Sequence, residues 1–147
     1  MTTKELARLY KRDIERFINE IELFNDENNL WKTKGSAKNS SGNLTLHIIG
    51  GLSFHIGVTL ANLDFVRDRD QEFVRKEVTR ESMTAQLNSL IPLIVDTITS
   101  MPEGKLNELH PNLYDGQKET IGFVLTQILI HLNYHLGQVN YLRRILE

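Results

Sequence analysis

The segment Ile128-Leu129-Ile130-His131-Leu132-Asn133-Tyr134-His135-Leu136-Gly137-Gln138 carries two histidines four residues apart in a proline-free helical pattern. Side chains at i and i+4 lie one turn apart on the same face of an α-helix, so both imidazoles can reach one ion. The apolar residues around them also follow helical spacing, and both histidines fall inside the edge of this apolar stripe. An imidazole that faces the core is stabilised by a ligand or a hydrogen bond. The segment therefore predicts a helix that supplies two of three metal ligands, and two hydrogen-bonded core histidines are the alternative.

The residues around this pair exclude two familiar metal sites. Leu132 follows His131, so the segment is not the His-Glu-x-x-His motif of a zinc peptidase, which includes its own general base. No glutamate stands three residues before either histidine, so the Glu-x-x-His repeat of di-iron helical bundles is missing. The predicted site is therefore mononuclear and rich in nitrogen ligands.

The composition is that of one soluble globular domain covering residues 1–147. The chain is 40% hydrophobic and 24% charged, with a net charge of −2 that offers no basic surface for nucleic acid or a membrane. It has no cysteine, which excludes disulfides and thiolate ligands, so a transition metal must be held by histidine and oxygen. The N-terminus lacks the apolar run of a signal peptide, and no segment reaches the ~18 apolar residues of a membrane span. We therefore expect a cytoplasmic protein.

Four amphipathic segments predict an all-α four-helix bundle with long crossover loops. We expect helices over residues 3–25, 43–65, from the Thr79 cap through the stripe that ends at Met101, and from 119 to the C-terminus. Thr2 and Glu5 have the spacing of a capping box. Pro92 should kink the third helix, because it removes one backbone hydrogen bond.

The second predicted helix contains two candidates for the third metal ligand, His47 and His55. They are about 80° apart around the helix and ~12 Å apart along it, so only one can share an ion with the other pair. We choose His47, because it lies one turn from Gly50 and Gly51, where the lack of side chains indicates a close helix or ligand. We expect His55 to be packed or hydrogen-bonded.

The remaining polar residues receive simpler interpretations. The charged run 67–73 is interpreted as a solvated connection, and His110 as an exposed bystander in the crossover 102–118. Gln138 lies one turn after His135 and is a candidate hydrogen-bond partner of that imidazole, with solvent exposure or a dimer contact as alternatives. Asp13 and Asp96 are carboxylates that could orient an imidazole, but nothing in the sequence places either near the histidines.

A second apolar patch on the last helix indicates contact with another surface. Phe123, Ile130, Tyr134 and Tyr141 lie on the side opposite to the predicted core face. We expect a homodimer through this patch, and packing against the first helix is the alternative.

Taken together, these residues resemble the DinB-like (YfiT-like) superfamily of metal-binding four-helix bundles. The resemblance covers nearly the whole chain and rests on Asn43-Leu44-x-Leu46-His47-x-x-Gly50, on Arg67-Asp68-Arg69-Asp70-x-Glu72-Phe73 and on His131-x-x-x-His135-x-Gly137-Gln138. The run 67–73 resembles a small bacterial branch of the superfamily. The resemblance implies a divalent ion, usually zinc or nickel, bound by His47, His131 and His135, and a homodimer. Some relatives are thiol S-transferases or isomerases, and others are described only as metal-dependent hydrolases or stress-related proteins.

These observations predict a metal-dependent enzyme with three histidine ligands between the second and fourth helices. Thiol transfer with a low-molecular-weight thiol as cosubstrate, or hydrolysis, is the expected chemistry, on an unknown small molecule. The alternatives are a non-catalytic protein in which the ion supports the fold, and a stress-related or interaction protein that presents the charged run 67–73.

Overall fold

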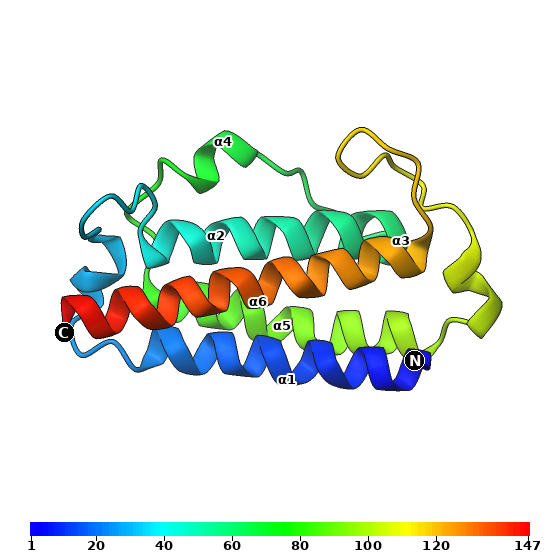
Figure 1. Cartoon of the computed structure of the whole chain (residues 1–147), viewed down its shortest axis with the longest axis horizontal. Helices are drawn as coiled ribbons and strands as arrows, with labels where there is room; N and C mark the ends of the chain where they lie inside the picture. Colours follow the sequence, from blue (N-terminus) through cyan, green and yellow to red (C-terminus); the bar gives the residue numbers. More distant parts are fainter.

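The computed structural model describes all 147 residues and contains helices without any β-strand, which confirms the predicted all-α class. Figure 1 shows long helical rods lying side by side. They are α1 (Thr3–Glu22), α2 (Ser41–Leu52) with its continuations η2 (Ser53–Val58) and α3 (Thr59–Ala61), α5 (Arg80–Thr99) and α6 (Ile121–Leu146). Three short helices lie in the connections: η1 (Glu27–Trp31), α4 (Arg69–Glu72) and η3 (Glu103–Asn107).

The long helices contact one another in a ring around one apolar core. Helix α1 packs on α5 and α6, and α2 packs on the same two helices from the other side. Twenty-nine buried hydrophobic residues form a single cluster between them. Polar contacts fix the α1–α6 pair: the Tyr10 hydroxyl donates to the carbonyl of Leu125 at 2.5 Å, and Asn140 and Arg143 of α6 donate to the Glu20 carboxylate. The rotation of α6 is therefore set by its contacts with α1, which leaves the histidine side facing α2.

The predicted caps at Thr2 and Thr79 are present, whereas the ends of the long helices differ from the predictions by two to four residues. Thr2 and Glu5 form the capping box, and Thr79 caps α5, which continues through Pro92 to Thr99. Helix α1 ends at Glu22 rather than 25. The second rod ends at Ala61 rather than 65, because Asn62 adopts a left-handed conformation with φ of 54°.

The second rod is not a regular α-helix throughout, since Ser53–Val58 forms a π-helical segment. Each π turn holds more residues than an α turn, so each residue in it advances less around the axis. His55 therefore lies closer to the azimuth of His47 than the 80° expected for an α-helix, and both side chains line the same cavity.

The same rod, Ser41–Ala61, is long and apolar enough to cross a membrane, with a mean hydropathy of 1.5 over its most apolar window. However, 61% of that window is buried inside the protein. Core helices of soluble proteins have the same length and composition, and α2 is in contact with α5 and α6 as such a helix. The cytoplasmic location stays a prediction.

The second apolar patch of α6 is exposed, so its residues do not pack against α1. The exposed fractions are 43% for Phe123, 57% for Ile130 and 64% for both Tyr134 and Tyr141. The alternative interpretation of this patch, packing against the first helix, is therefore wrong.

Candidate metal centre

The three histidines predicted as ligands lie together between α2 and α6. Nε2 of His131 is 3.1 Å from Nε2 of His47 and 3.0 Å from Nε2 of His135. All three nitrogens lie within 4.8 Å of one another. The rings meet edge to face, with centroid separations of 4.5 to 5.2 Å. His47 is buried, and the other two are half-buried.

Glu72 fixes the orientation of His47 from the opposite ring nitrogen. Nδ1 of His47 lies 3.0 Å from Oε1 of Glu72, and because a carboxylate only accepts, Nδ1 carries the proton and Nε2 keeps its lone pair. Arg67 donates to the same carboxylate through Nε at 2.8 Å and Nη2 at 3.0 Å. Burial alone would raise the pKa of Glu72, but the hydrogen bonds from His47 and Arg67 lower it below its usual value. Glu72 is therefore an ionised carboxylate that accepts a hydrogen bond from Nδ1 of His47.

The face of α2 that carries His47 is shaped to receive this carboxylate. Asn43 donates through its side-chain amide to the carbonyls of Glu72 at 2.9 Å and Arg75 at 2.8 Å, which holds the segment after α4 against α2. At Gly50 a Cβ atom would lie 1.8 Å from Oε2 of Glu72. Phe73 covers the His47 ring, with centroids 4.9 Å apart. The neighbour that requires Gly50 is therefore a carboxylate, and neither a helix nor a ligand.

Gln138 plays the corresponding part for His135. Its Oε1 lies 2.7 Å from Nδ1 of His135, one turn earlier on α6, so Nδ1 donates and Nε2 again keeps its lone pair. The predicted partnership of Gln138 with an imidazole is thus present in the structure.

The three imidazoles have too few N–H protons for the two short contacts between their Nε2 atoms, which favours a bound cation. With both flanking histidines protonated on Nδ1, two Nε2 lone pairs point at His131, whose own Nε2 can donate a single proton to one of them. The other short contact then has no proton between its nitrogens, so a lone pair faces a nitrogen that cannot donate to it. A divalent ion accepts all three lone pairs at once, and tetrahedral zinc with Zn–N of 2.0–2.1 Å keeps its ligand atoms about 3.3 Å apart. The separations of 3.0 and 3.1 Å are within a few tenths of an ångström of that requirement.

The surroundings of the two half-buried imidazoles, His131 and His135, keep them neutral. Burial, with smaller contributions from the neighbouring histidines and Arg67, lowers the pKa of His131 to about 4. Burial also lowers the pKa of His135, although the Gln138 hydrogen bond acts in the opposite direction. Neutral imidazole is the form that binds a metal, so these residues need not lose a proton to become ligands near neutral pH.

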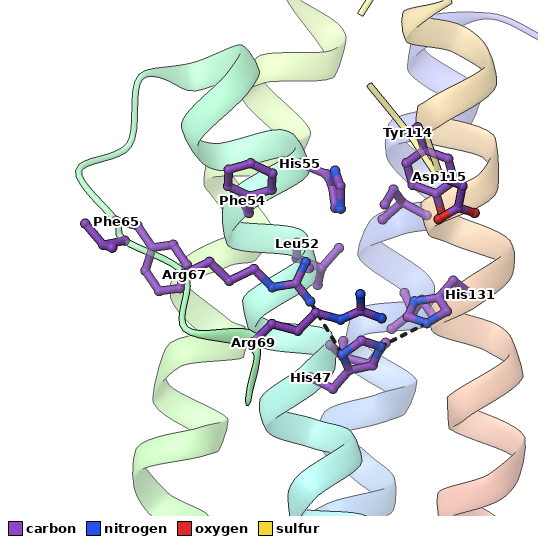
Figure 2. A pocket seen from close by; sticks show the side chains of 15 residues that line it. His47, Leu52, Phe54, His55, Phe65, Arg67, Arg69, Tyr114, Asp115 and His131 are labelled. Carbon is purple, nitrogen blue, oxygen red and sulfur yellow. Dashed lines mark hydrogen bonds between the residues drawn. The ribbon is translucent and has the colours of Figure 1, made fainter. Parts of the chain in front are cut away.

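A cavity of about 820 Å³ opens onto His47 and His131 (Figure 2). Leu52, Phe54 and Ile128 contribute apolar wall, and Arg67 and Arg69 lie on the side of the α3–α4 connection. Tyr114 and Asp115 close the other end from a turn in the crossover between η3 and α6. His47 and His131 are therefore placed on the wall of a space that can hold a small molecule.

Two histidines outside the cluster occupy positions that correct or refine the predictions. His55 is packed between Phe54 and Tyr114, with ring centroids 5.1 and 5.4 Å away, and its Nδ1 has no partner. His110 is only 6% exposed, so its assignment as an exposed bystander is wrong. Its ring nitrogens lie 3.2 Å from the carbonyl of His55 and 3.0 Å from that of Asn112, which fastens the crossover to the second rod.

The carboxylate that orients an imidazole is neither of the two candidates considered from the sequence. Asp13 is buried but contacts Arg12 and the amide of Asn133, and Asp96 is exposed to solvent. Glu72 was missed because the run 67–73 was interpreted as a solvated connection. In the structure its members Arg67 and Glu72 point inward, and Glu72 is 7% exposed.

Comparison with known proteins identifies the family of the chain without a named activity. No protein of curated function matches it. The sequence model of the family described as "Protein of unknown function (DUF1572)" matches residues 1–147. Because this match spans the complete sequence printed above, the chain belongs to the DUF1572 family.

Proposed function

We propose that this protein is a metal-dependent enzyme of the DinB-like superfamily, with a four-helix-bundle fold and one divalent ion bound by His47, His131 and His135. Zinc or nickel is the proposed ion, and a thiol transfer or a hydrolysis is the proposed reaction. The observation that supports this best is the convergence of three Nε2 atoms, two of which have their lone pairs directed inward by Glu72 and Gln138.

The donor set favours an open site over a closed structural one. Structural zinc sites use four protein ligands, whereas catalytic sites use three and leave a position for water or substrate. Within the chain, the cluster of candidate ligands contains three residues and no fourth. The cavity borders two of these ligands, so a guest molecule can approach the remaining position.

The residues around the cluster perform distinct tasks in such a reaction. His47, His131 and His135 would hold the divalent ion, which would supply Lewis-acid chemistry by lowering the pKa of a bound water molecule or thiol. Glu72 and Gln138 hold the imidazoles in the tautomers and orientations that binding requires. Leu52, Phe54 and Ile128 give the cavity an apolar wall against which the carbon skeleton of a substrate can pack.

Metal analysis followed by cobalt substitution tests this proposal. Protein purified without chelators should contain close to one equivalent of a divalent ion, and the His47→Ala variant should contain little. In the cobalt-substituted protein, excess 2-mercaptoethanol should change the visible absorption spectrum, because an open position takes up the thiolate. A spectrum that stays tetrahedral and unchanged would indicate a closed site and a non-catalytic protein.

We also propose that two copies of the chain associate through the exposed apolar patch of α6. Phe123, Ile130, Tyr134 and Tyr141 extend this surface over several helical turns, and Ile145, 56% exposed, continues it. A contiguous apolar surface of this kind is typical of an interface between subunits. The ring of Tyr134 also lies 5.2 Å from that of His135, so such an interface would be next to the metal ligands.

A further inference from the structure

Arg69 is a cation in the cavity that the protein does not pair with an acid. The chain's ion pairs include Arg67 with Glu72, but none involves Arg69. Figure 2 shows the Arg69 side chain crossing the cavity, with its guanidinium directed toward the rings of His131 and His47. An arginine directed at two of the proposed metal ligands has no structural partner there, so its position favours a role toward a bound molecule.

The segment that presents Arg69 is fixed on both sides. Before it, Arg67 is held by two hydrogen bonds to the Glu72 carboxylate. After it, the Glu72 carbonyl is held by Asn43 of α2, and the Asp68 side chain caps α4 by accepting from the amide of Gln71. The backbone of Arg69 is therefore positioned by the same contacts that orient His47, while its side chain is exposed and free of other partners.

The balance of charge in the cavity favours a single negative charge beside the metal ligands. The charge of Arg67 is offset by Glu72, so Arg69 and the Asp115 carboxylate are the uncompensated charges on the lining. Burial is the main reason that the pKa of His55 is lowered to about 4. The positive charges of Arg67 and, less strongly, Arg69 also lower it, which shows that they act across the cavity. A group bound at Arg69, beside the ion rather than on it, would meet one free cation and the Asp115 carboxylate in the same cavity, so a single negative charge suits this position better than two.

We propose that the substrate is a small carboxylic acid whose carboxylate is bound by Arg69, while its reacting group lies at the metal. This inference rests on the proposed function and adds the chemical class of its substrate. A guanidinium offers two parallel N–H donors that match the two oxygens of a carboxylate. The apolar wall of Leu52, Phe54 and Ile128 then faces the carbon skeleton of the bound acid.

A pair of thiols that differ only in charge tests the role of Arg69. The cobalt-substituted protein is titrated with 3-mercaptopropionate and with 3-mercaptopropionamide under anaerobic conditions, and the change in visible absorption gives both dissociation constants. In the wild type the carboxylate should bind on the order of ten-fold more tightly, as expected for a charge-assisted bidentate contact. In Arg69→Ala this ratio should fall to about one, and Arg69→Lys should keep part of it, because lysine supplies the charge without the fork.

Matched controls separate this effect from a general loss of charge or of the site. Arg8→Ala removes an exposed arginine from α1, far from the cavity lining, and should keep the wild-type ratio. Neutral 2-mercaptoethanol should bind the wild type and Arg69→Ala equally, since it reports only the open metal position. An Arg69→Ala protein that keeps the ten-fold preference would overturn the proposal. Inorganic phosphate that displaces 3-mercaptopropionate better than propionate does would show that the proposed ligand class is wrong.

The same variants distinguish failure of this inference from failure of the proposed function. If no thiol perturbs the cobalt spectrum of the wild type, the open metal site is wrong, and calorimetric titration with propionate and propionamide then tests Arg69 by itself. Binding of propionate that is lost in Arg69→Ala would support the carboxylate site without the metal chemistry. Absence of propionate binding to the wild type would overturn it.

Discussion

Replacing Gly50 by alanine tests whether Glu72 orients His47, the proposed metal ligand on α2. The new Cβ atom would lie 1.8 Å from Oε2 of Glu72, whereas ordinary van der Waals contact begins at 3.4 Å. The carboxylate must therefore retreat by about 1.6 Å, which is 3.4 minus 1.8. Its hydrogen bond to Nδ1 of His47, now 3.0 Å long, cannot survive a displacement of that size in its present form.

The expected loss appears in metal affinity more than in folding. Removing the hydrogen-bond partner of a metal-ligating histidine typically lowers affinity 10- to 100-fold, which corresponds to roughly 1.4–2.7 kcal/mol. The atom displaced from Gly50 is the end of a flexible side chain, so Glu72 can swing away without unfolding α2. Alanine also favours a helix interior over glycine by about 0.5–1 kcal/mol, which offsets part of the disruption. The metal-free protein should therefore melt close to the wild-type temperature.

The neighbouring glycine supplies the matched control. A Cβ atom at Gly51 would meet only Nη2 of Arg67, at 3.9 Å, and it gains the same helix propensity. Zinc affinity of both variants is measured by competition with a chromophoric chelator. We expect Gly51→Ala to bind as the wild type does and Gly50→Ala to bind at least ten-fold more weakly. Equal affinities would refute the assignment of Glu72 as the residue that holds His47.

Three further predictions follow from the contacts of single residues. In His131→Ala, metal content and melting temperature should fall together, because binding of the ion is linked to folding; full occupancy in this variant would remove His131 from the ligand set. His55 has a folded-state pKa of about 4, below its unfolded value of 6.5, so lowering the pH from about 6.5 toward 4 adds a proton to the unfolded chain alone and reduces the free energy of unfolding. Urea denaturation of the metal-free His55→Asn variant over that range should show a shallower pH dependence, while zinc binding at pH 7 is kept; an unchanged slope would contradict the low pKa. Ile130→Glu places a charge in the exposed patch of α6 and should shift a dimer to monomer in sedimentation velocity, and a dimer of unchanged stability would exclude this face.

The features that could be predicted from the sequence depend on short-range periodicity. Helix spacing places His131 and His135 on one face whatever the rest of the chain does, and side-chain caps at Thr2 and Thr79 need only the adjacent backbone. His47 was separable from His55 because eight residues of α-helix turn the two rings apart. The π-helical segment weakens this separation, because it places His55 on the same cavity as His47. His55 nevertheless stays outside the cluster of His47, His131 and His135.

The features that were missed depend on where loops fold in space. A run of alternating charges such as 67–73 is solvated in most proteins, and only the packing of this connection on α2 shows that Glu72 is buried. His110 was expected to be exposed because it precedes a proline in a polar crossover. The backbone instead turns back there, with the amide of His110 donating to the carbonyl of Glu119. This turn places the ring of His110 in the interior. Neither outcome has a signature within the local sequence.

Residues 43, 47 and 50 explain why the ion site and the α3–α4 connection belong to one structural unit. Their spacing of four and then three residues places them on one face of α2. Each serves the same neighbour: Asn43 holds the backbone of Glu72, His47 donates to its carboxylate, and Gly50 leaves the space that this carboxylate occupies. The connection so anchored also carries Arg69, which is directed at the ligand cluster. A single face of one helix therefore fixes the first proposed metal ligand, its carboxylate partner and the segment that presents a cation to the cavity, so a substitution on this face should disturb metal binding and ligand selectivity together.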